Sequence, residues 1–305
     1  MKKSCCFFVL CIVIMLICSC GDEQKTISGG DKDGVYWELK GGTLTISGKG
    51  DMPNYSSESE ESEITPNIPW GFDVKKVIIE EGVTSIGDSA FDRCSKLTNV
   101  TIPESVKSIG SKAFYGCTSL KKITIPESVV SIGAWAFCLC ESLEEIVIPE
   151  GVNIIEAWTF HRCTSLKKVE LPQQLEHIMD HAFYMCESLE KIELPEGIKY
   201  IDIGVFLACR SLKEITLPES LEYIMRNAFS HCDSLEKVIL SDKVTRIEGV
   251  PFNMCKSLTK IYIPESVNDI SDEAFSNSAL ETICGKAGSY AETYAKENGY
   301  KFQAE

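Results

Sequence analysis

Cysteine is the residue type whose number and spacing in this sequence most suggest chemistry. The 305 residues contain 15 cysteines, and one set of them recurs every 23 residues: Cys94, Cys117, Cys140, Cys163, Cys186, Cys209, Cys232 and Cys255. Neighbouring members of such a column are close enough for disulfides, but side chains that point the same way suit the disulfide dihedral poorly. A metal site needs ligands that converge on one point, and a column is a line. We therefore expect buried free thiols that pack as small apolar groups, with Cys138 and Cys284, outside the column, as the exposed ones.

A second column with the same spacing is almost entirely acidic. Its members are Glu81, Glu104, Glu127, Glu150, Gln173, Glu196, Glu219, Asp242 and Glu265. Calcium could relieve the repulsion between stacked carboxylates, but it takes about six to eight oxygen ligands, and one carboxylate per repeat supplies few. We expect a solvated acidic edge, with no metal and no other cofactor.

Motifs of the common catalytic sites are absent from the sequence. There is no nucleophile elbow, phosphate loop, His-Glu-x-x-His or paired Cys-x-x-Cys motif. The four histidines, at positions 161, 177, 181 and 231, fall in columns that vary between repeats. We therefore do not expect an enzyme. The formal charge of −15 argues against nucleic-acid binding, which needs clustered Lys and Arg.

The columns belong to an internal repeat that dictates the architecture. Phenylalanine marks nine units without a slip, at positions 91, 114, 137, 160, 183, 206, 229, 252 and 275. Columns of isoleucine and leucine keep the same step of 23 residues. A unit of this length cannot bury its apolar face alone, so neighbouring units must stack on one another.

The unit that spans residues 120–143 shows the elements expected in each repeat. Residues 120–125 alternate apolar and polar side chains, as a strand with one buried face does. Pro126 ends that strand, residues 129–132 are expected to bend, and residues 136–143 suggest a short helical turn. Stacked units would pair their strands in parallel at a spacing of about 4.8 Å. The sequence therefore predicts an α/β repeat solenoid.

The repeat resembles the BspA-type leucine-rich repeats of bacterial surface proteins. The resemblance rests on Ile-Pro-Glu-Ser-Val at 102–106 and 125–129, Ser-Ile-Gly at 131–133, and Ala-Phe-x-x-Cys-x-Ser-Leu at 113–120, and it covers residues 74–283. It implies a curved, right-handed leucine-rich-repeat coil with 23-residue units. It also implies display on a cell surface and binding to host proteins or other cells, and it implies no catalytic residues.

Both ends of the stack have sequences suited to capping it. In the N-terminal cap, residues 35–73, Gly41-Gly42 predicts a β-hairpin, and the Ser/Glu stretch 56–63 predicts an acidic loop. In the C-terminal cap, residues 284–305, Ser289 and Glu292 form a capping-box pattern. We expect a helix from there to Asn298, with Tyr290 and Tyr294 on the face that covers the last coil.

The N-terminal segment indicates export and lipid anchoring. Residues 1–19 have the basic start, apolar run and small residues of a signal peptide. Residues 17–20 resemble a bacterial lipobox, which would make Cys20 the lipidated N-terminus, and residues 20–34 predict a flexible tether. The acidic pair Asp22–Glu23 resembles the surface-export signals of Bacteroidetes-type lipoproteins. We therefore expect a secreted lipoprotein on the outer-membrane surface.

Two of the columns that vary between repeats carry a cluster of aromatic and apolar side chains, and such columns are free to serve recognition. The column two positions before Phe carries Trp135, Trp158 and His181, and the column before the repeated Ile carries Ile154, His177, Tyr200 and Tyr223. All seven lie in units three to seven. In the first two units the same columns carry serine or lysine. Exposed aromatic clusters mark binding sites, so these residues are the candidate ligand contacts. The alternative is that they pack between neighbouring coils.

These observations predict an adhesin-like surface module that binds a protein partner, such as a host matrix or cell-surface protein. The alternative function is a surface lipoprotein that binds glycans, because Trp and Tyr also stack on sugar rings.

Overall fold

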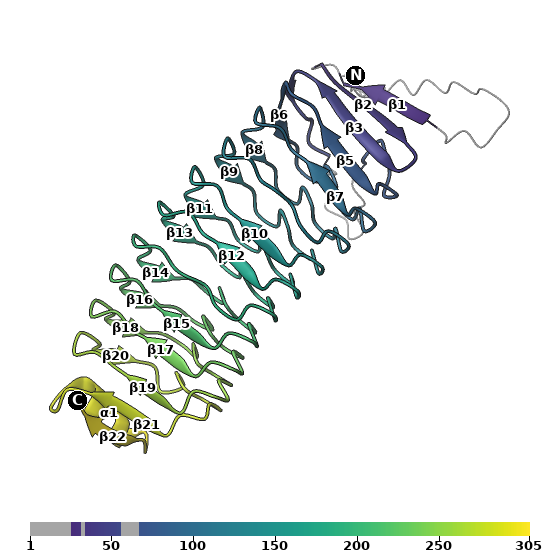
Figure 1. Cartoon of the computed structure of the whole chain (residues 1–305). Helices are drawn as coiled ribbons and strands as arrows, with labels where there is room; N and C mark the ends of the chain where they lie inside the picture. Colours follow the sequence, from purple (N-terminus) through teal and green to yellow (C-terminus); the bar gives the residue numbers. More distant parts are fainter. Residues whose placement is uncertain (1–25, 32–33, 56–66) are drawn as a thin grey trace, which may run out of the picture.

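The computed structural model describes residues 26–31, 34–55 and 67–305. The expected signal peptide (1–19), the lipidation site Cys20 and the acidic loop (56–63) lie outside the described residues. The described chain forms an elongated stack of parallel coils, with a β-sheet cap at the N-terminal end and a helix at the C-terminal end (Figure 1). We number the coils one to nine by their phenylalanines, from Phe91 to Phe275.

The first strand column lies where the alternating Leu-x-x-Ile-x-Ile pattern predicts it. The strands pair in parallel, with partners 23 residues apart in the first two pairs, as in Ile146–Val169, and 22 apart in the last, as in Ile261–Ile283. The pairs are β10 (Glu145–Val147) with β12 (Lys168–Glu170), β15 (Glu214–Thr216) with β17 (Lys237–Ile239), and β19 (Lys260–Tyr262) with β21 (Thr282–Gly285). We call the outer surface of these coils the strand face.

A second strand column replaces the bend expected around residues 129–132. At the Ser-Ile position, two residues per coil pair in parallel with the next coil, for example Ser108–Ser131. The strands are β4 (Gly50–Asp51), β6 (Val83–Ile86), β8 (Ser108–Ile109), β9 (Ser131–Ile132), β11 (Ile154–Ile155), β13 (His177–Ile178), β14 (Tyr200–Ile201), β16 (Tyr223–Ile224), β18 (Arg246–Ile247) and β20 (Asp269–Ile270). In the described chain this pairing joins β4 to β9, β11 to β13 and β14 to β20, and it is interrupted between β9 and β11 and between β13 and β14.

The segment around each phenylalanine is a run of turns, and the helical turn expected there is wrong. Every second amide in this segment donates a hydrogen bond to the next coil. Trp135 N–H donates to Ala157 O at 3.1 Å, and Phe137 N–H donates to Thr159 O at 3.0 Å. The amides between them donate hydrogen bonds within their own coil and so form turns. For example, Cys138 N–H donates to Trp135 O at 3.0 Å. A helix would direct all of these amides into its own coil, whereas this arrangement joins neighbouring coils here as well.

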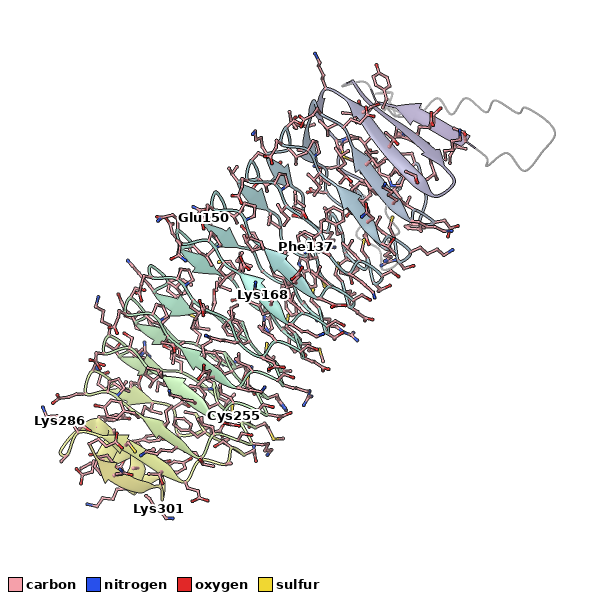
Figure 2. All side chains as sticks on the ribbon, viewed as in Figure 1. Phe137, Glu150, Lys168, Cys255, Lys286 and Lys301 are labelled. Carbon is pink, nitrogen blue, oxygen red and sulfur yellow. The ribbon has the colours of Figure 1, made fainter. Side chains whose placement is uncertain are left out.

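The phenylalanine column forms the centre of the core. Successive rings lie 5.2 to 5.7 Å apart, and Phe91 to Phe252 have no exposed surface. Figure 2 places Phe137 inside its coil and Lys168 outside. Each buried ring contributes about 2–3 kcal/mol by removing apolar area from water. The column therefore supplies much of the stabilisation that one isolated unit lacks.

The cysteine column consists of buried free thiols, as expected. Cys140 Sγ donates to the carbonyl of Phe114 at 3.2 Å, and the same bond recurs from Cys117 to Cys255 at 3.2 to 3.3 Å. The expectation that Cys138 and Cys284 are exposed is wrong, because both are buried. Cys138 lies among the turns that join neighbouring coils, and Cys284 lies in β21 beneath the C-terminal cap.

The N-terminal cap contains the predicted hairpin. Strands β2 (Val35–Lys40) and β3 (Thr43–Gly48) pair antiparallel on either side of Gly41-Gly42, and β3 continues in parallel into β5 (Lys76–Ile79) and then β7 (Asn99–Thr101). The outer strand β1 (Thr26–Gly30) pairs with β2, so part of the stretch expected to be a tether is ordered. Trp70 ends the phenylalanine column, with its ring 5.9 Å from that of Phe91.

The C-terminal cap covers the last coil with aromatic side chains. Helix α1 (Tyr290–Glu297) packs Tyr294 against Phe275, with ring centroids 6.3 Å apart, and β22 (Lys301–Ala304) adds a parallel strand beside β21. The predicted capping box does not form, because Glu292 bonds to the residue before the N-cap. Glu292 Oε2 accepts from Gly288 N–H at 2.8 Å, whereas the Ser289 side chain makes no capping bond.

Candidate functional site

The acidic column forms an exposed edge with a structural role. Glu150 Oε2 accepts from the backbone N–H of Gln173 at 3.0 Å, and Glu196 Oε1 accepts from that of Glu219 at 3.1 Å. Each of these carboxylates thus satisfies an amide of the following coil. The residues described in the structure contain no cluster of three or more His, Cys, Asp or Glu side chains that could hold a metal ion.

The first variable column forms a stack of rings, which we call the aromatic ladder. Trp135 and Trp158 lie parallel at 4.8 Å between centroids, and Trp158 and His181 lie parallel at 4.2 Å. His161 and Tyr184 pack beside them, with centroids 5.0 Å and 6.1 Å from that of Trp158. All five side chains are half-buried. The ring faces are therefore largely covered by neighbouring rings, which matches the packing alternative.

The backbone beneath the aromatic ladder is left-handed. Trp135, Trp158 and His181 have φ of 64°, 62° and 56°, and Lys112 in the same column has 56°, so this conformation belongs to the turn and not to the tryptophans. The ladder ends at Gly204, where a Cβ would lie 2.8 Å from the His181 ring. A side chain at this position of the next coil would therefore force the His181 ring to shift.

Burial controls the charge of the histidines in the ladder. Neither ring nitrogen of His161 has a hydrogen-bond partner, and both are buried. The pKa of His161 is lowered to about 4. Burial is the largest cause, and the nearby charges of Arg162 and His181 add to it. Burial also lowers the pKa of His181. The ladder is therefore an uncharged, mainly apolar cluster at neutral pH.

The second variable column, which we call the strand-edge column, presents its side chains on neighbouring strands. Strand pairing places Ile154 beside His177, and Tyr200 beside Tyr223. The Tyr200 hydroxyl and His177 Nδ1 are 3.0 Å apart, which links the two pairs. All four side chains are half-exposed.

Two carboxyl groups follow this column in the chain. The pKa of Asp202 is raised to about 6. Burial is the larger cause, and a hydrogen bond with Asp180 is the next. Asp202 Oδ1 also accepts from the N–H of Ile203 at 2.8 Å.

The structure therefore brings the seven candidate contacts together as two columns on coils three to seven. Within one coil, three residues of the chain separate the strand-edge column from the aromatic ladder, as between His177 and His181. Sequence reasoning missed His161 and Tyr184 as members of the ladder. Their signal was present, because each stands three positions after a ladder residue, at Trp158 and His181.

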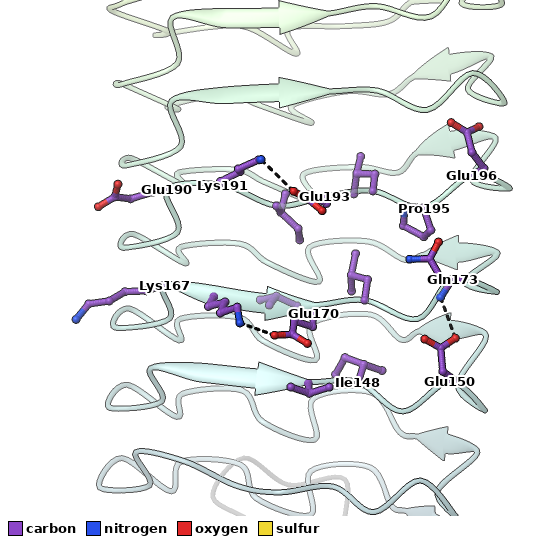
Figure 3. A pocket seen from close by; sticks show the side chains of 16 residues that line it. Ile148, Glu150, Lys167, Glu170, Gln173, Glu190, Lys191, Glu193, Pro195 and Glu196 are labelled. Atoms are coloured by element: carbon purple, nitrogen blue, oxygen red, sulfur yellow. Dashed lines mark hydrogen bonds and ion pairs between the residues drawn. The ribbon is translucent and has the colours of Figure 1, made fainter.

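The strand face contains a cavity. It has a volume of about 900 Å³ and extends from Val147 in coil four to Glu196 in coil six (Figure 3). Lys168 and Glu170 form an ion pair in it, and Lys191 and Glu193 form another at 3.0 Å. The sequence indicates the strand face, with Val147, Lys168 and Glu170, as the second place to look for ligand contacts, but it does not predict a cavity there.

No described helix has the length and hydropathy that crossing a membrane requires.

Comparisons with solved structures agree with the repeat architecture. A leucine-rich repeat protein from Eubacterium ventriosum ATCC 27560 is 26% identical, with a TM-score of 0.60 over 86% of this chain and 73% of that one. The pneumococcal vaccine antigen PcpA is 16% identical, with a TM-score of 0.50 over 91% of this chain and 98% of that one, and this likeness concerns the fold alone. No curated protein sequence matches the chain.

The family comparison covers most of the chain. Residues 64–190 and 176–295 match the BspA type leucine rich repeat region in its six-copy form. The matched segments contain the phenylalanine, cysteine and acidic columns and both variable columns described above. The chain therefore belongs to the BspA-type leucine-rich-repeat family.

Proposed function

We propose that this protein is a non-enzymatic, adhesin-like binding module of a bacterial cell surface and that its partner is a protein. The observation that carries the proposal is the strand-edge column. The core columns stay constant through the stack, while this outward column changes from Ser85, Ser108 and Ser131 to Ile154, His177, Tyr200 and Tyr223 and then to Arg246 and Asp269.

The geometry of this column suits a protein interface. Its aromatic side chains are held on paired strands between coils on both sides, so they lose little conformational freedom on binding. Tyr and Trp dominate interface hot spots. The outer edges of the aromatic ladder extend the surface, whereas its ring faces are covered.

The same covering disfavours glycan binding through Trp158. A sugar that stacks on an indole needs a free ring face, and Trp158 has Trp135 on one side and His181 on the other. Tyr200 and Tyr223 remain accessible, so a glycan array still separates the two functions.

The surface location rests on the N-terminal sequence. We infer that residues 1–19 are removed, that Cys20 carries lipid, and that the chain is held at the outer-membrane surface. The family membership of the chain supports this inference, because BspA-type repeats occur in bacterial surface proteins.

The experiment uses substitutions that the protein's own repeat contains. The column variant replaces Ile154, His177, Tyr200 and Tyr223 with serine, which coils one to three have at this position. A control replaces Ile239 and Tyr262 with threonine, as found at Thr101, Thr124 and Thr216 of the same strand-face column. Both variants remove exposed apolar surface, the column variant from the strand-edge column and the control from the strand face.

Binding to a panel of immobilised extracellular-matrix proteins should distinguish the variants. We expect the wild-type protein to bind at least one of them, the column variant to bind about 30-fold more weakly, which is about 2 kcal/mol, and the control to bind normally. Equal binding by the column variant would remove the column from the interface. Binding to a glycan array and to none of the proteins would replace the proposed partner class.

A further inference from the structure

Charges on most of the strand face are arranged so that neighbouring coils attract each other. The column that starts each strand segment alternates in sign over six coils: Lys121, Glu144, Lys167, Glu190, Lys213 and Glu236. Lys213 and Glu190 are 2.7 Å apart. In the next column, Lys122 pairs with Glu145. Opposite charges on neighbouring strands stabilise a sheet.

Coils five and six break this pattern in two columns at once. Lys168 and Lys191 stand at equivalent positions of neighbouring coils, as do Glu170 and Glu193. Each lysine therefore pairs along its own strand segment, Lys168 with Glu170 and Lys191 with Glu193 at 3.0 Å. The result is a square of charge, with two cations on one side and two carboxylates on the other.

This charge square lines the cavity on the strand face (Figure 3). The side chains are accessible, with 64% of Lys168, 50% of Glu170, 59% of Lys191 and 84% of Glu193 exposed. The parallel pairing of the first strand column is also interrupted between coils five and six. In the described chain, β12 pairs with β10 and has no partner strand in coil six.

We propose that this cavity binds an extended peptide segment that carries an acidic and a basic side chain two residues apart. In an extended chain, side chains two residues apart lie on one face, about 6.6–6.8 Å from each other. The same spacing separates Lys168 from Glu170 on β12. A segment laid along the coil therefore brings its carboxylate over the two lysines and its guanidinium over the two glutamates.

Binding replaces two ion pairs with four charge-assisted contacts. Exposed ion pairs such as Lys191–Glu193 contribute little stability, so opening them costs little. A carboxylate that contacts two ammonium groups, and a guanidinium that donates to two carboxylates, form charge-assisted bonds with both members of each like-charged pair. The cavity adds the apolar side chain of Val147, which is 51% exposed.

This site is distinct from the strand-edge column. The inference rests on the proposed function only in that the partner is a protein. Its test uses peptides and none of the matrix proteins, so the two proposals can fail independently.

The probes are two isomeric, dye-labelled heptapeptides added to the purified chain. Thr-Thr-Glu-Val-Arg-Thr-Thr places both charges on one face of an extended chain, and Thr-Thr-Glu-Arg-Val-Thr-Thr places them on opposite faces. Fluorescence anisotropy should show at least tenfold tighter binding of the first peptide, and the difference should shrink as salt is added. Equal affinities, or no binding of either peptide, would overturn the proposal.

Charge variants then locate the site. Lys168→Glu with Lys191→Glu should abolish the preference for the first peptide, and exchange of all four charges should restore it, because the peptide can lie in either direction. Lys237→Glu with Lys260→Glu is the matched control, since it makes the same change of net charge in the same column of coils eight and nine. A loss in that control as large as in the site variant would show a general charge effect and would contradict the assignment.

Discussion

The indole of Trp158 and the imidazole of His181 lie parallel, with centroids 4.2 Å apart and planes 5° from each other. Trp135 lies on the other face of the same indole. Residues that seem free to vary in sequence therefore carry part of the packing between coils three, four and five. Any change in this ladder must be judged on stability as well as on binding.

Trp158→Lys should destabilise the protein. The change removes stacking on both sides of the indole, at about 0.5–1.5 kcal/mol for each aromatic pair, and we expect a loss of about 2 kcal/mol in the free energy of unfolding. Urea denaturation provides the measurement. Lysine is compatible with the backbone, because Lys112 occupies the same column with the same left-handed φ. Lys112→Ser, with the residue found at Ser89, is the control and should change little. A stable Trp158→Lys protein would mean that the ladder contributes no packing energy.

Phe160→Ala should be the more damaging change. The Phe160 ring is fully buried, with neighbouring rings at 5.7 and 5.3 Å, and large-to-small changes at such sites cost about 3–5 kcal/mol. Lys121→Ala, at an exposed position, should stay within about 0.5 kcal/mol of wild type. Equal melting temperatures for the two variants would contradict the assignment of buried and exposed columns.

Asp92→Asn should stabilise the protein at neutral pH. Asp92 stands in a variable column, yet it is buried, and desolvation raises the pKa of its carboxyl from 3.8 to about 6, against the opposing charges of Arg93 and Lys112. Because the folded state holds this proton more tightly than the unfolded state does, the contribution of Asp92 is most favourable below pH 4 and is lost as the pH rises through 6.

The difference in melting temperature between Asp92→Asn and wild type should therefore grow between pH 4 and pH 6 and then level off. Comparison of the two proteins at each pH cancels the titration of the remaining carboxyl groups. A difference that is independent of pH would show that Asp92 keeps an ordinary pKa in the folded protein.

The ten cysteines from Cys94 to Cys284 should not react with a thiol reagent at pH 8 in the native state. All are buried and free, and burial raises the pKa of Cys94 to about 12 and that of Cys138 to about 12. The thiolate is the reactive form, so reaction should wait for unfolding. Ten thiols should then be counted in denaturant. Rapid modification of Cys138 or Cys284 in the native protein would place that thiol at the surface.

Cys20→Ala should give a protein without lipid. The prediction follows from residues 17–20, and it is checked by growing cells with an alkyne-labelled fatty acid and detecting the label on the purified chain. Ser19→Ala is a neighbouring control that keeps the cysteine. Label on the Cys20→Ala protein would place the modification elsewhere.

The sequence predicted the stack of coils because the repeat is a property of spacing alone. Columns such as Phe91 to Phe275 repeat only if every unit makes the same contacts with the next one, which is what a solenoid requires. The hairpin at Gly41-Gly42 was also predictable, because turn residues act locally. The helix that begins at Tyr290 lies where the sequence predicts it, although the Ser289 side chain makes no capping bond.

The details that sequence reasoning missed depend on contacts between coils. The turns around Phe137 pair with Ala157 and Thr159 of the next coil, so their local pattern looked helical. Cys138 departs from the regular column, yet it is buried. Likewise, the ring contacts of Trp158 with His161 and His181 combine a separation of three residues with one of 23, and neither spacing alone predicts a stack.

The hydrogen bonds between coils run from one coil to the next, and this has a mechanical consequence. A pull between the two ends of the molecule loads the contacts between neighbouring coils, so the stack yields by peeling from an end rather than by shearing as one block. Each coil that peels away releases 23 residues, which extend to roughly 80 Å at about 3.5 Å per residue. Under tension the protein lengthens in steps of one coil, while the coils still stacked keep their outward columns in register.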